Sequence, residues 1–155
     1  MTALEEAFNA RNKKLNKIEV VKNLKTPQEA YDKLDEYAKN GFDSVPEEDK
    51  TYFLKCFGIY YRPVTPGKFM LKLRIPGGFM KAEQAVVVGE CAKEFGQDYI
   101  DLTTRQQCEL RYLTIESLPI IIKRLDGVGI SAFQTGVDNI RGIVADPFDD
   151  LAFDN

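Results

Sequence analysis

The chain lacks histidine altogether, which removes the commonest metal ligand and the usual general base. Ser-His-Asp triads and histidine-containing zinc sites are thereby excluded within this chain. Cysteine is scarce, and Cys56, Cys91 and Cys108 stand too far apart for a C-x-x-C metal signature. An odd number of cysteines fits a reducing compartment with free thiols, and we interpret all three as small buried hydrophobic residues.

Long hydrophobic runs are missing too. No secretory h-region opens the chain and no apolar run approaches the length of a membrane span, so we expect a cytoplasmic protein. The net charge of -3 and the pI near 5.1 argue against a nucleic-acid or membrane-surface binder. With 155 residues, 44% hydrophobic and 29% charged, the sequence predicts one compact domain with appendages.

The most informative segment is 69–78, in which Lys72 and Arg74 stand two positions apart. Alternation in a strand puts both cations on one face, while Leu71, Leu73 and Ile75 face the other way. A strand with one apolar and one cationic side, stopped by Pro-Gly-Gly, indicates a sheet whose open face holds an anionic partner. Two solvated cations on an exposed face would give the same pattern, so that interpretation stays open.

Helix and strand patterns alternate along the rest of the chain. A weakly amphipathic helix is predicted over 4–25, and the capping box at 26–29 opens a second helix from 27 to about 39. Residues 45–49 are a connector. Strands are predicted at 54–61, 69–75, 99–102, 108–113 and 130–133, and helices at 82–95 and from Thr114 to Leu125. The turn at 62–68 makes a hairpin of the first two strands.

From Phe69 onward the order is β-α-β-β-α-β, which predicts an α+β fold. This would be a ferredoxin-like sandwich with an extra N-terminal strand hairpin and a helical lead-in. We divide the chain into a helical lead-in at 1–50, a ferredoxin-like half-domain at 51–147 and an acidic tail at 148–155. With the usual strand order, the ends of the first and second strands and the start of the third share one edge.

That arrangement predicts which charges meet on the face that the helices leave uncovered. Arg74 comes close to 103–105, a segment whose hydroxyls and guanidinium suit either an anion site or an ordinary polar loop. The topology does not by itself bring Arg141 there. The face carries charges in place of the stacking aromatics of an RNA-recognition sheet, which disfavours RNA binding. The predicted neighbours on this face are Lys72, Arg74, Glu109 and Arg111, with Leu110 and Tyr112 pointing into the core.

Four segments together resemble one protein family. They are Leu54-Lys-Cys-Phe-Gly-Ile-Tyr-Tyr61, Phe69-Met-Leu-Lys-Leu-Arg-Ile-Pro-Gly-Gly78, Asp101-Leu-Thr-Thr-Arg-Gln106 and Asp138-Asn-Ile-Arg-Gly142. In this order and spacing they look like the amino-terminal ferredoxin-like half-repeat of the siroheme-dependent nitrite and sulfite reductases. Upstream, segments 16–19, 37–42 and 46–49 resemble the helical lead-in of ferredoxin-dependent members, so the resemblance covers nearly the whole chain.

The resemblance implies an enzyme that reduces nitrite to ammonia or sulfite to sulfide, a six-electron reaction at siroheme coupled to a 4Fe-4S cluster. Siroheme is a polycarboxylate and both substrates are oxyanions, so a cationic sheet face complements them. By the resemblance, Arg74 and Arg141 would anchor the substrate anion as catalytic residues. The residues that would neutralise or hydrogen-bond the siroheme carboxylates are Lys72, Thr103, Thr104, Arg105 and Arg111.

The sequence departs from the family pattern in three ways. Lys72 stands where many members have arginine, and Glu109 replaces a common glutamine, so we leave Glu109 out of the cofactor set. The chain also stops at Asn155, where family members continue into a second repeat and the cysteine motifs that hold the cluster. We therefore interpret it as an amino-terminal fragment, expected to be inactive and to bind no cofactor by itself. Its partners would be the second half-repeat, an electron donor such as ferredoxin, and nitrite or sulfite.

Other interpretations stay open. A precorrin-3B synthase shares the repeat but performs oxygen chemistry on a corrinoid precursor. A free-standing half-repeat would bind a tetrapyrrole or a partner protein through the same face without catalysis. Nitrite and sulfite require the same cationic pocket, so the sequence does not choose between them.

Overall fold

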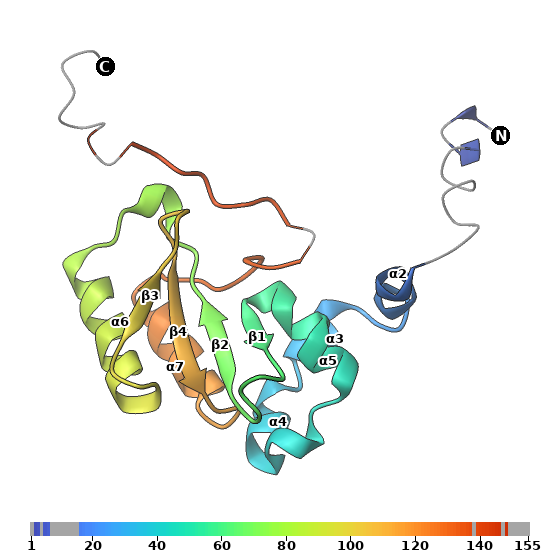
Figure 1. Cartoon of the computed structure of the whole chain (residues 1–155), viewed down its shortest axis with the longest axis horizontal. Helices are drawn as coiled ribbons and strands as arrows, with labels where there is room; N and C mark the ends of the chain where they lie inside the picture. Colours follow the sequence, from blue (N-terminus) through green and yellow to red (C-terminus); the bar gives the residue numbers. More distant parts are fainter. Residues whose placement is uncertain (1, 4, 7–15, 138, 147, 149–155) are drawn as a thin grey trace.

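The computed structural model describes residues 2, 3, 5, 6, 16–137, 139–146 and 148. A helical lead-in comes first (Figure 1): α2 (Lys17–Lys22), α3 (Pro27–Tyr31), α4 (Leu34–Asn40), the 3₁₀ segment η2 (Phe42–Ser44), α5 (Glu47–Thr51) and η3 (Phe53–Phe57). The remaining elements are β1 (Ile59–Tyr61), β2 (Phe69–Lys72), η4 (Pro76–Gly78), α6 (Ala82–Phe95), β3 (Ile100–Leu102), β4 (Cys108–Leu113) and α7 (Leu118–Gly127). None of the helices in the described part of the chain combines the length and apolarity that a bilayer crossing requires.

The sheet has the order β1-β2-β4-β3, and every neighbouring pair is antiparallel. The β1–β2 pair is the predicted hairpin. Helices α6 and α7 lie together on one face of the sheet, and the C-terminal segment runs across one end of it (Figure 1). The arrangement confirms the α+β, ferredoxin-like class, and α6 and β4 occupy the residues that the sequence predicted.

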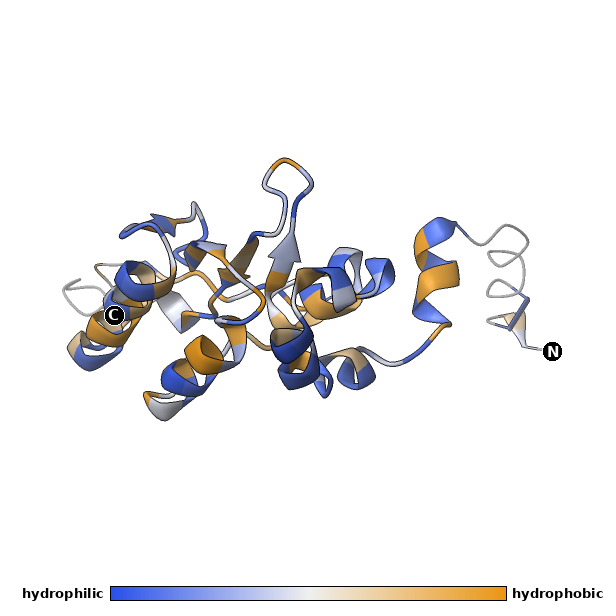
Figure 2. Cartoon of the chain, turned by 90° about the horizontal axis from the view of Figure 1, so that it is seen from below, coloured by the Kyte–Doolittle hydropathy of each residue, from blue (hydrophilic) through white to orange (hydrophobic). Residues whose placement is uncertain are grey.

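The first predicted helix, over 4–25, is only partly observed. Among the described residues, Glu5 and Glu6 are helical. Helix α2 follows, and it begins after Asn16, whose side chain accepts hydrogen bonds from the N–H groups of Ile18 and Glu19. Helix α2 has no buried residue and lies at one end of the molecule, apart from the sheet (Figure 2). The rest of the prediction, at 4 and 7–15, lies outside the described residues.

The second predicted helix is present but divided. Its capping box is confirmed, because Thr26 Oγ1 accepts from the Glu29 N–H and the Glu29 carboxylate accepts from the Thr26 N–H at 2.5 Å. Asp32 and Lys33 then interrupt the helix and separate α3 from α4. The lead-in is thus a set of short helices, of which α3, α4 and α5 lie on the β1 side of the sheet (Figure 1).

A buried polar cluster ties these short helices together. Asp49 has no exposed surface; its Oδ2 accepts a hydrogen bond from the Tyr37 hydroxyl at 2.6 Å, and its Oδ1 lies 2.5 Å from Lys25 Nζ. Burial, followed by the hydrogen bond to Asp49, raises the pKa of Tyr37. Such partners are needed because an unpaired buried carboxylate costs on the order of several kcal/mol.

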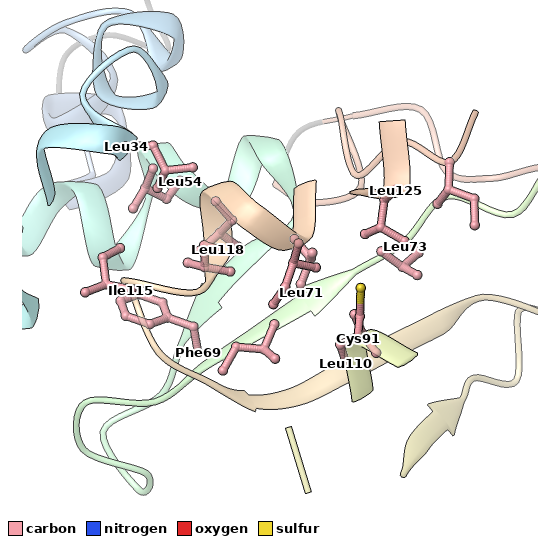
Figure 3. Packing of buried hydrophobic residues seen from close by; sticks show 14 of the residues in the cluster. Leu34, Leu54, Phe69, Leu71, Leu73, Cys91, Leu110, Ile115, Leu118 and Leu125 are labelled. Carbon is pink, nitrogen blue, oxygen red and sulfur yellow. The ribbon is translucent and has the colours of Figure 1, made fainter. Parts of the chain in front are cut away.

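A continuous core lies between the sheet and the helices. Alternate residues of β2 and β4 point into it, so Leu71 and Leu110 have no exposed surface. Cys91 from α6 and Leu118 and Leu125 from α7 belong to the same cluster (Figure 3). The lead-in shares this core, although the boundary at residue 50 stays a prediction. Its buried members are Ala30, Leu34, Tyr37 and Val45, and Phe53 and Leu54 of η3 follow directly after it.

The strand predicted over 54–61 is wrong in its first half. Residues 53–57 form η3, and β1 starts only at Ile59. The break falls at Gly58, whose φ of 75° lies in the left-handed region, and a Cβ there would lie 2.6 Å from the Lys72 carbonyl oxygen. Aromatic and branched residues are buried in either conformation, so composition did not distinguish a 3₁₀ segment from a strand.

The last predicted strand, 130–133, is also wrong, since the structure has a single bridge there, between Ser131 and Arg74. Strand β1 already occupies the outer edge of β2, because the Lys72 N–H donates to the Gly58 carbonyl at 2.8 Å. Segment 130–133 can therefore pair only with Arg74, just beyond the end of β2. There the Arg74 N–H donates to the Ser131 carbonyl at 2.8 Å.

Strand β4 contains a bulge that turns Tyr112 away from the core, contrary to the prediction. Leu71 pairs with Leu110, but Phe69 pairs with Leu113, so β4 has one residue more than β2 between these pairs. Tyr112 has a φ of 60° and is partly exposed. Because of the extra residue, Leu113 and not Tyr112 points into the core.

The helix predicted from Thr114 begins later, at Leu118. Residues 114–117 form a turn in which Ser117 Oγ donates to the Thr114 carbonyl at 2.8 Å. Pro119 has no N–H and fits only the first turn of a helix, which fixes where α7 starts.

Candidate functional site

Lys72 and Arg74 line the same cleft at the C-terminal end of β2, which confirms that they share one face of the sheet. Leu71, Leu73 and Ile75, which alternate with them, are buried in the core. The cleft has a volume of about 300 Å³. Its other lining residues come from β1, from the loop after β3 and from the C-terminal segment: Tyr60, Arg105, Gln107, residues 134–137 and residues 139–142.

This cleft is cationic. Lys72, Arg74, Arg105 and Arg141 line it, and no carboxylate does so among the residues that the structure describes. Several like charges in a concave site concentrate anions. Guanidinium groups in particular bind oxyanions and carboxylates through charge-assisted hydrogen bonds. We call this site the cationic cleft.

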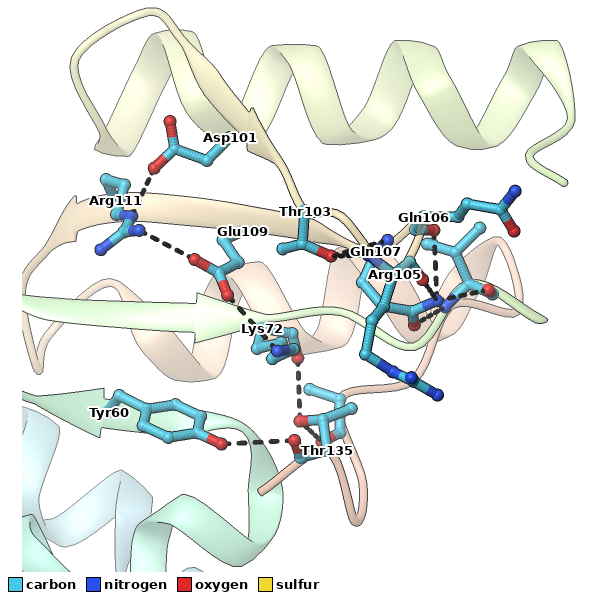
Figure 4. Close-up of polar contacts among 12 residues, drawn as sticks. Tyr60, Lys72, Asp101, Thr103, Arg105, Gln106, Gln107, Glu109, Arg111 and Thr135 are labelled. Carbon is cyan, nitrogen blue, oxygen red and sulfur yellow. Dashed lines mark hydrogen bonds and ion pairs between the residues drawn. The ribbon is translucent and has the colours of Figure 1, made fainter. Parts of the chain in front are cut away.

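Gln107 fixes the loop that carries Arg105. Its Oε1 accepts from the Ile75 N–H at 2.8 Å, and its Nε2 donates to the carbonyls of Ile75, Arg105 and Gln106 at 2.9, 2.9 and 3.1 Å. Thr103 Oγ1 accepts from the N–H groups of Arg105 and Gln107 at 3.3 and 3.1 Å. The end of β2 and the loop are therefore held in one geometry (Figure 4).

The C-terminal segment closes the cleft and brings Arg141 into it. Arg74 donates hydrogen bonds to three backbone carbonyls within 133–140, and Arg105 Nη2 donates to the Gly142 carbonyl at 2.9 Å. Strand topology alone did not place Arg141 at this site. The long-range hydrogen bonds from Arg74 and Arg105 to the neighbouring backbone bring it there.

Tyr60 and Thr135 anchor the segment on its β1 side, and neither was a predicted site residue. The Tyr60 hydroxyl donates to the Thr135 carbonyl at 3.2 Å, and Thr135 Oγ1 donates to the Lys72 carbonyl at 3.1 Å (Figure 4). Burial, followed by the nearby Glu109 carboxylate, raises the pKa of Tyr60. Nothing in the local sequence marks these contacts, because the partners lie 75 and 63 positions apart.

A second set of charges crosses the same face and is internally neutralised. Glu109 Oε2 accepts from Arg111 Nη2 at 2.8 Å, and Glu109 Oε1 lies 3.5 Å from Lys72 Nζ. Arg111 Nε donates to Asp101 Oδ2 at 2.7 Å (Figure 4). We call Lys72, Glu109, Arg111 and Asp101 the ion-pair row. Lys72 belongs to both the row and the cationic cleft.

The structure brings together only part of the predicted site. The four cations of the cleft include both predicted substrate residues and two of the predicted cofactor residues. Arg111 lies in the ion-pair row, Thr104 is exposed, and Thr103 lines a separate, mostly apolar cavity of about 710 Å³ beside β3. The roles of all these residues toward a ligand stay predictions.

The cationic cleft fits carboxylates and oxyanions, whereas the described residues do not fit an iron–sulfur cluster. No group of three or more His, Cys, Asp or Glu side chains that could hold a metal occurs in the described part of the chain. Cys91 and Cys108 are free and buried, as predicted, whereas Cys56 is only half-buried. Burial raises the pKa of Cys91 and Cys108, which favours the thiol over the thiolate that binds iron.

Comparisons with known proteins agree with the fold. Residues 62–128 match the family model described as Nitrite/Sulfite reductase ferredoxin-like half domain. The ferredoxin–nitrite reductase of Synechococcus elongatus is 39% identical over 139 residues, covering 89% of this chain and 27% of that protein. The ferredoxin–nitrite reductase of Leptolyngbya laminosa is 36% identical over 134 residues, covering 86% and 26%. The solved structure of the Mycobacterium tuberculosis NirA protein matches with a TM-score of 0.79 at 27% identity, covering 88% of this chain and 28% of that one.

The chain thus spans about a quarter of the length of the curated relatives that it matches. The match with NirA extends over most of this chain, lead-in included, so the likeness is not restricted to the sheet. The resemblance inferred from the four sequence segments is confirmed, and the chain belongs to the nitrite/sulfite reductase family, whose ferredoxin-like half domain it carries.

Proposed function

We propose that the chain supplies the amino-terminal half of the anion and cofactor site of a ferredoxin-dependent nitrite or sulfite reductase. The reaction would be the six-electron reduction of nitrite to ammonia or of sulfite to sulfide. The observation that carries this proposal is the cationic cleft, in which four cations converge without a carboxylate among the described residues. The names of the relatives, ferredoxin–nitrite reductases, make nitrite the first substrate to test.

In this proposal Arg74 and Arg141 anchor the substrate anion. Nitrite and sulfite both carry negative charge on oxygen atoms, which accept hydrogen bonds from guanidinium N–H groups. Arg141 lines the cleft, and its side chain has no hydrogen-bond or ion-pair partner among the described residues, so its donors are available to a ligand. Donors aimed at those oxygens also polarise the bonds that the reduction must break.

Siroheme fits the proposal because its carboxylates need cationic partners. Lys72 and Arg105 of the cleft would hold them, together with Arg111, Thr103 and Thr104 by the family resemblance. When bound, siroheme coupled to a 4Fe-4S cluster would supply the electrons of the reduction. The cluster ligands would come from another part of the enzyme, since the described cysteines do not form such a set. By itself the chain would therefore bind the anion without reducing it.

Exposed apolar residues near the end of the sheet support a partner surface. Ile140, Ile143, Leu102 and Phe79 are between 74% and 89% exposed, and the last two line the apolar cavity beside β3. Apolar surface of this kind marks interaction sites. We propose that the second half-repeat of the reductase covers it and that ferredoxin is the electron donor. The free thiols of Cys91 and Cys108 fit a reducing compartment such as the cytoplasm.

An NMR titration of the chain with nitrite and with sulfite tests the proposal. We expect saturable shifts of the arginine Nε–H signals of the cleft, and a loss of affinity of roughly ten- to a hundredfold in Arg141→Gln. The control is Arg124→Gln, because Arg124 is also exposed but pairs with Glu94 outside the cleft. Absence of saturable shifts at the cleft, or an equal loss in the control, would contradict the proposal.

A further inference from the structure

Arg74 uses most of its hydrogen-bonding capacity on the protein itself. Its Nε donates to the Phe133 carbonyl at 3.3 Å, and its Nη2 donates to the carbonyls of Gln134 and Ile140, the latter at 3.3 Å. A guanidinium has one N–H on Nε and two on each Nη. The three bonds therefore occupy Nε and Nη2 completely, and only Nη1 stays available to a ligand in the cationic cleft.

The bond to Ile140 fixes the backbone from which the Arg141 side chain extends, because that carbonyl belongs to the peptide group preceding Arg141. Apolar packing does little to hold this point of the chain, since Ile140 is 89% exposed and Arg141 is exposed too. On the far side the nearest anchor is the bond from Arg105 to the Gly142 carbonyl. A segment with so little buried surface opens easily unless polar contacts tie it down.

We propose that Arg74 is the positioning residue of Arg141. It holds the backbone at Phe133, Gln134 and Ile140 beside the cationic cleft so that the Arg141 guanidinium stays directed at the site, while its own Nη1 faces the bound anion. The inference rests on the proposed function, because it specifies how the nitrite or sulfite site is assembled. A positioning role also means that lysine cannot replace Arg74. A lysine keeps the charge, but its single ammonium group lacks the planar set of donors that reaches three carbonyls.

The first measurement needs no ligand. Trypsin cleavage after Arg141, followed by mass spectrometry, reports how often the segment opens. We expect this cleavage to be roughly tenfold faster in Arg74→Lys and Arg74→Gln, because the bonds to the carbonyls are lost. Arg124→Gln is the matched control, since Arg124 donates a two-bond fork to Glu94 outside the cleft. Unchanged cleavage in both Arg74 variants overturns the proposal.

Hydrogen exchange of the β4 amides in the same samples separates local release from loss of the fold. We expect β4 to stay protected while cleavage after Arg141 accelerates. An equal loss of protection in β4 would mean that Arg74 only supports the fold, and it would overturn the proposal.

A nitrite titration then tests the consequence for the site. Arg74→Lys keeps the charge, so a purely electrostatic role predicts wild-type affinity, whereas positioning predicts a loss of roughly tenfold or more. Adding Arg74→Lys to Arg141→Gln should weaken binding less than Arg74→Lys does in the wild-type chain, because part of the Arg74 effect acts through Arg141. Wild-type affinity in Arg74→Lys overturns the proposal. If the wild-type chain binds no nitrite, the proposed function fails, and the trypsin measurement still decides the role of Arg74.

Discussion

The cationic cleft and the ion-pair row lie on the same face of one sheet, yet they present opposite electrostatic conditions. In the row, Arg111 lies between two carboxylates, with nitrogen–oxygen distances of 2.7 and 2.8 Å. In the cleft, Arg105 and Arg141 meet no carboxylate among the described residues. A cation attracts an external anion strongly only where no internal carboxylate already neutralises it. The number of basic residues on a face therefore does not identify an anion site.

Lys72 and Tyr60 mark the boundary between the two regions. Lys72 lines the cleft while its ammonium lies 3.5 Å from Glu109, and Tyr60 holds the cleft wall while its pKa responds to the same carboxylate. Substitutions at this boundary should therefore change anion binding in the cleft and ion pairing in the row to different extents.

The largest expected effect comes from the scaffold that both regions share. Gly58→Ala should lower the free energy of unfolding by roughly 2–4 kcal/mol, because a Cβ there meets the Lys72 carbonyl and the φ is positive. Urea denaturation measures this. Gly67→Ala is the matched control: its φ is also positive, but a Cβ there meets nothing within 4 Å, so we expect about 1 kcal/mol. Equal losses would show that the close approach at Gly58 does not matter.

The comparison itself is tested by removing one arginine from each region. Arg105→Gln should weaken nitrite binding roughly ten- to a hundredfold, whereas Arg111→Gln should change it by no more than about twofold. Isothermal titration at low and high salt measures both, and the affinity should fall as ionic strength rises. A similar loss in the two variants would mean that the row is as available to anions as the cleft.

A smaller effect should follow from removing one carboxylate. Glu109→Gln keeps the shape but leaves Lys72 uncompensated, so nitrite binding should tighten by roughly two- to tenfold. Asp101→Asn is the control, because Asp101 pairs with Arg111 and does not line the cleft. Isothermal titration with nitrite measures both variants. Tighter nitrite binding in Asp101→Asn as well would mean that the effect comes from the change in net charge and not from Lys72.

The smallest effect concerns the titration of Tyr60. Burial is the main cause of its raised pKa, and Glu109 is the second, so Glu109→Gln should lower this pKa without returning it to the usual tyrosine value. A raised pKa in the folded state means that the contribution of Tyr60 to stability is complete below the unfolded value and is lost as the pH rises through the folded one. Tyrosinate absorbance between about pH 9 and 12 follows the change, with Tyr60→Phe to assign it. No shift in Glu109→Gln would place Tyr60 outside the influence of the row.

Short-range patterns determined what the sequence by itself could establish. The capping box at Thr26 and Glu29 and the residues of α6 and β4 follow from periodicities and end signals within a few positions. The shared face of Lys72 and Arg74 follows from strand alternation in the same way. These features needed no knowledge of distant residues.

Tertiary structure decided wherever residues far apart in the chain compete for one place. Gly58 ends a 3₁₀ segment because its backbone approaches Lys72, and the bulge before Leu113 depends on the register with β2. Arg141 reaches the cleft through hydrogen bonds from side chains more than 30 positions away, which no local pattern encodes. These long-range pairings decide whether a cation is available to an external anion or is paired with a carboxylate of the same chain. The division between the cationic cleft and the ion-pair row therefore exists only in the folded molecule.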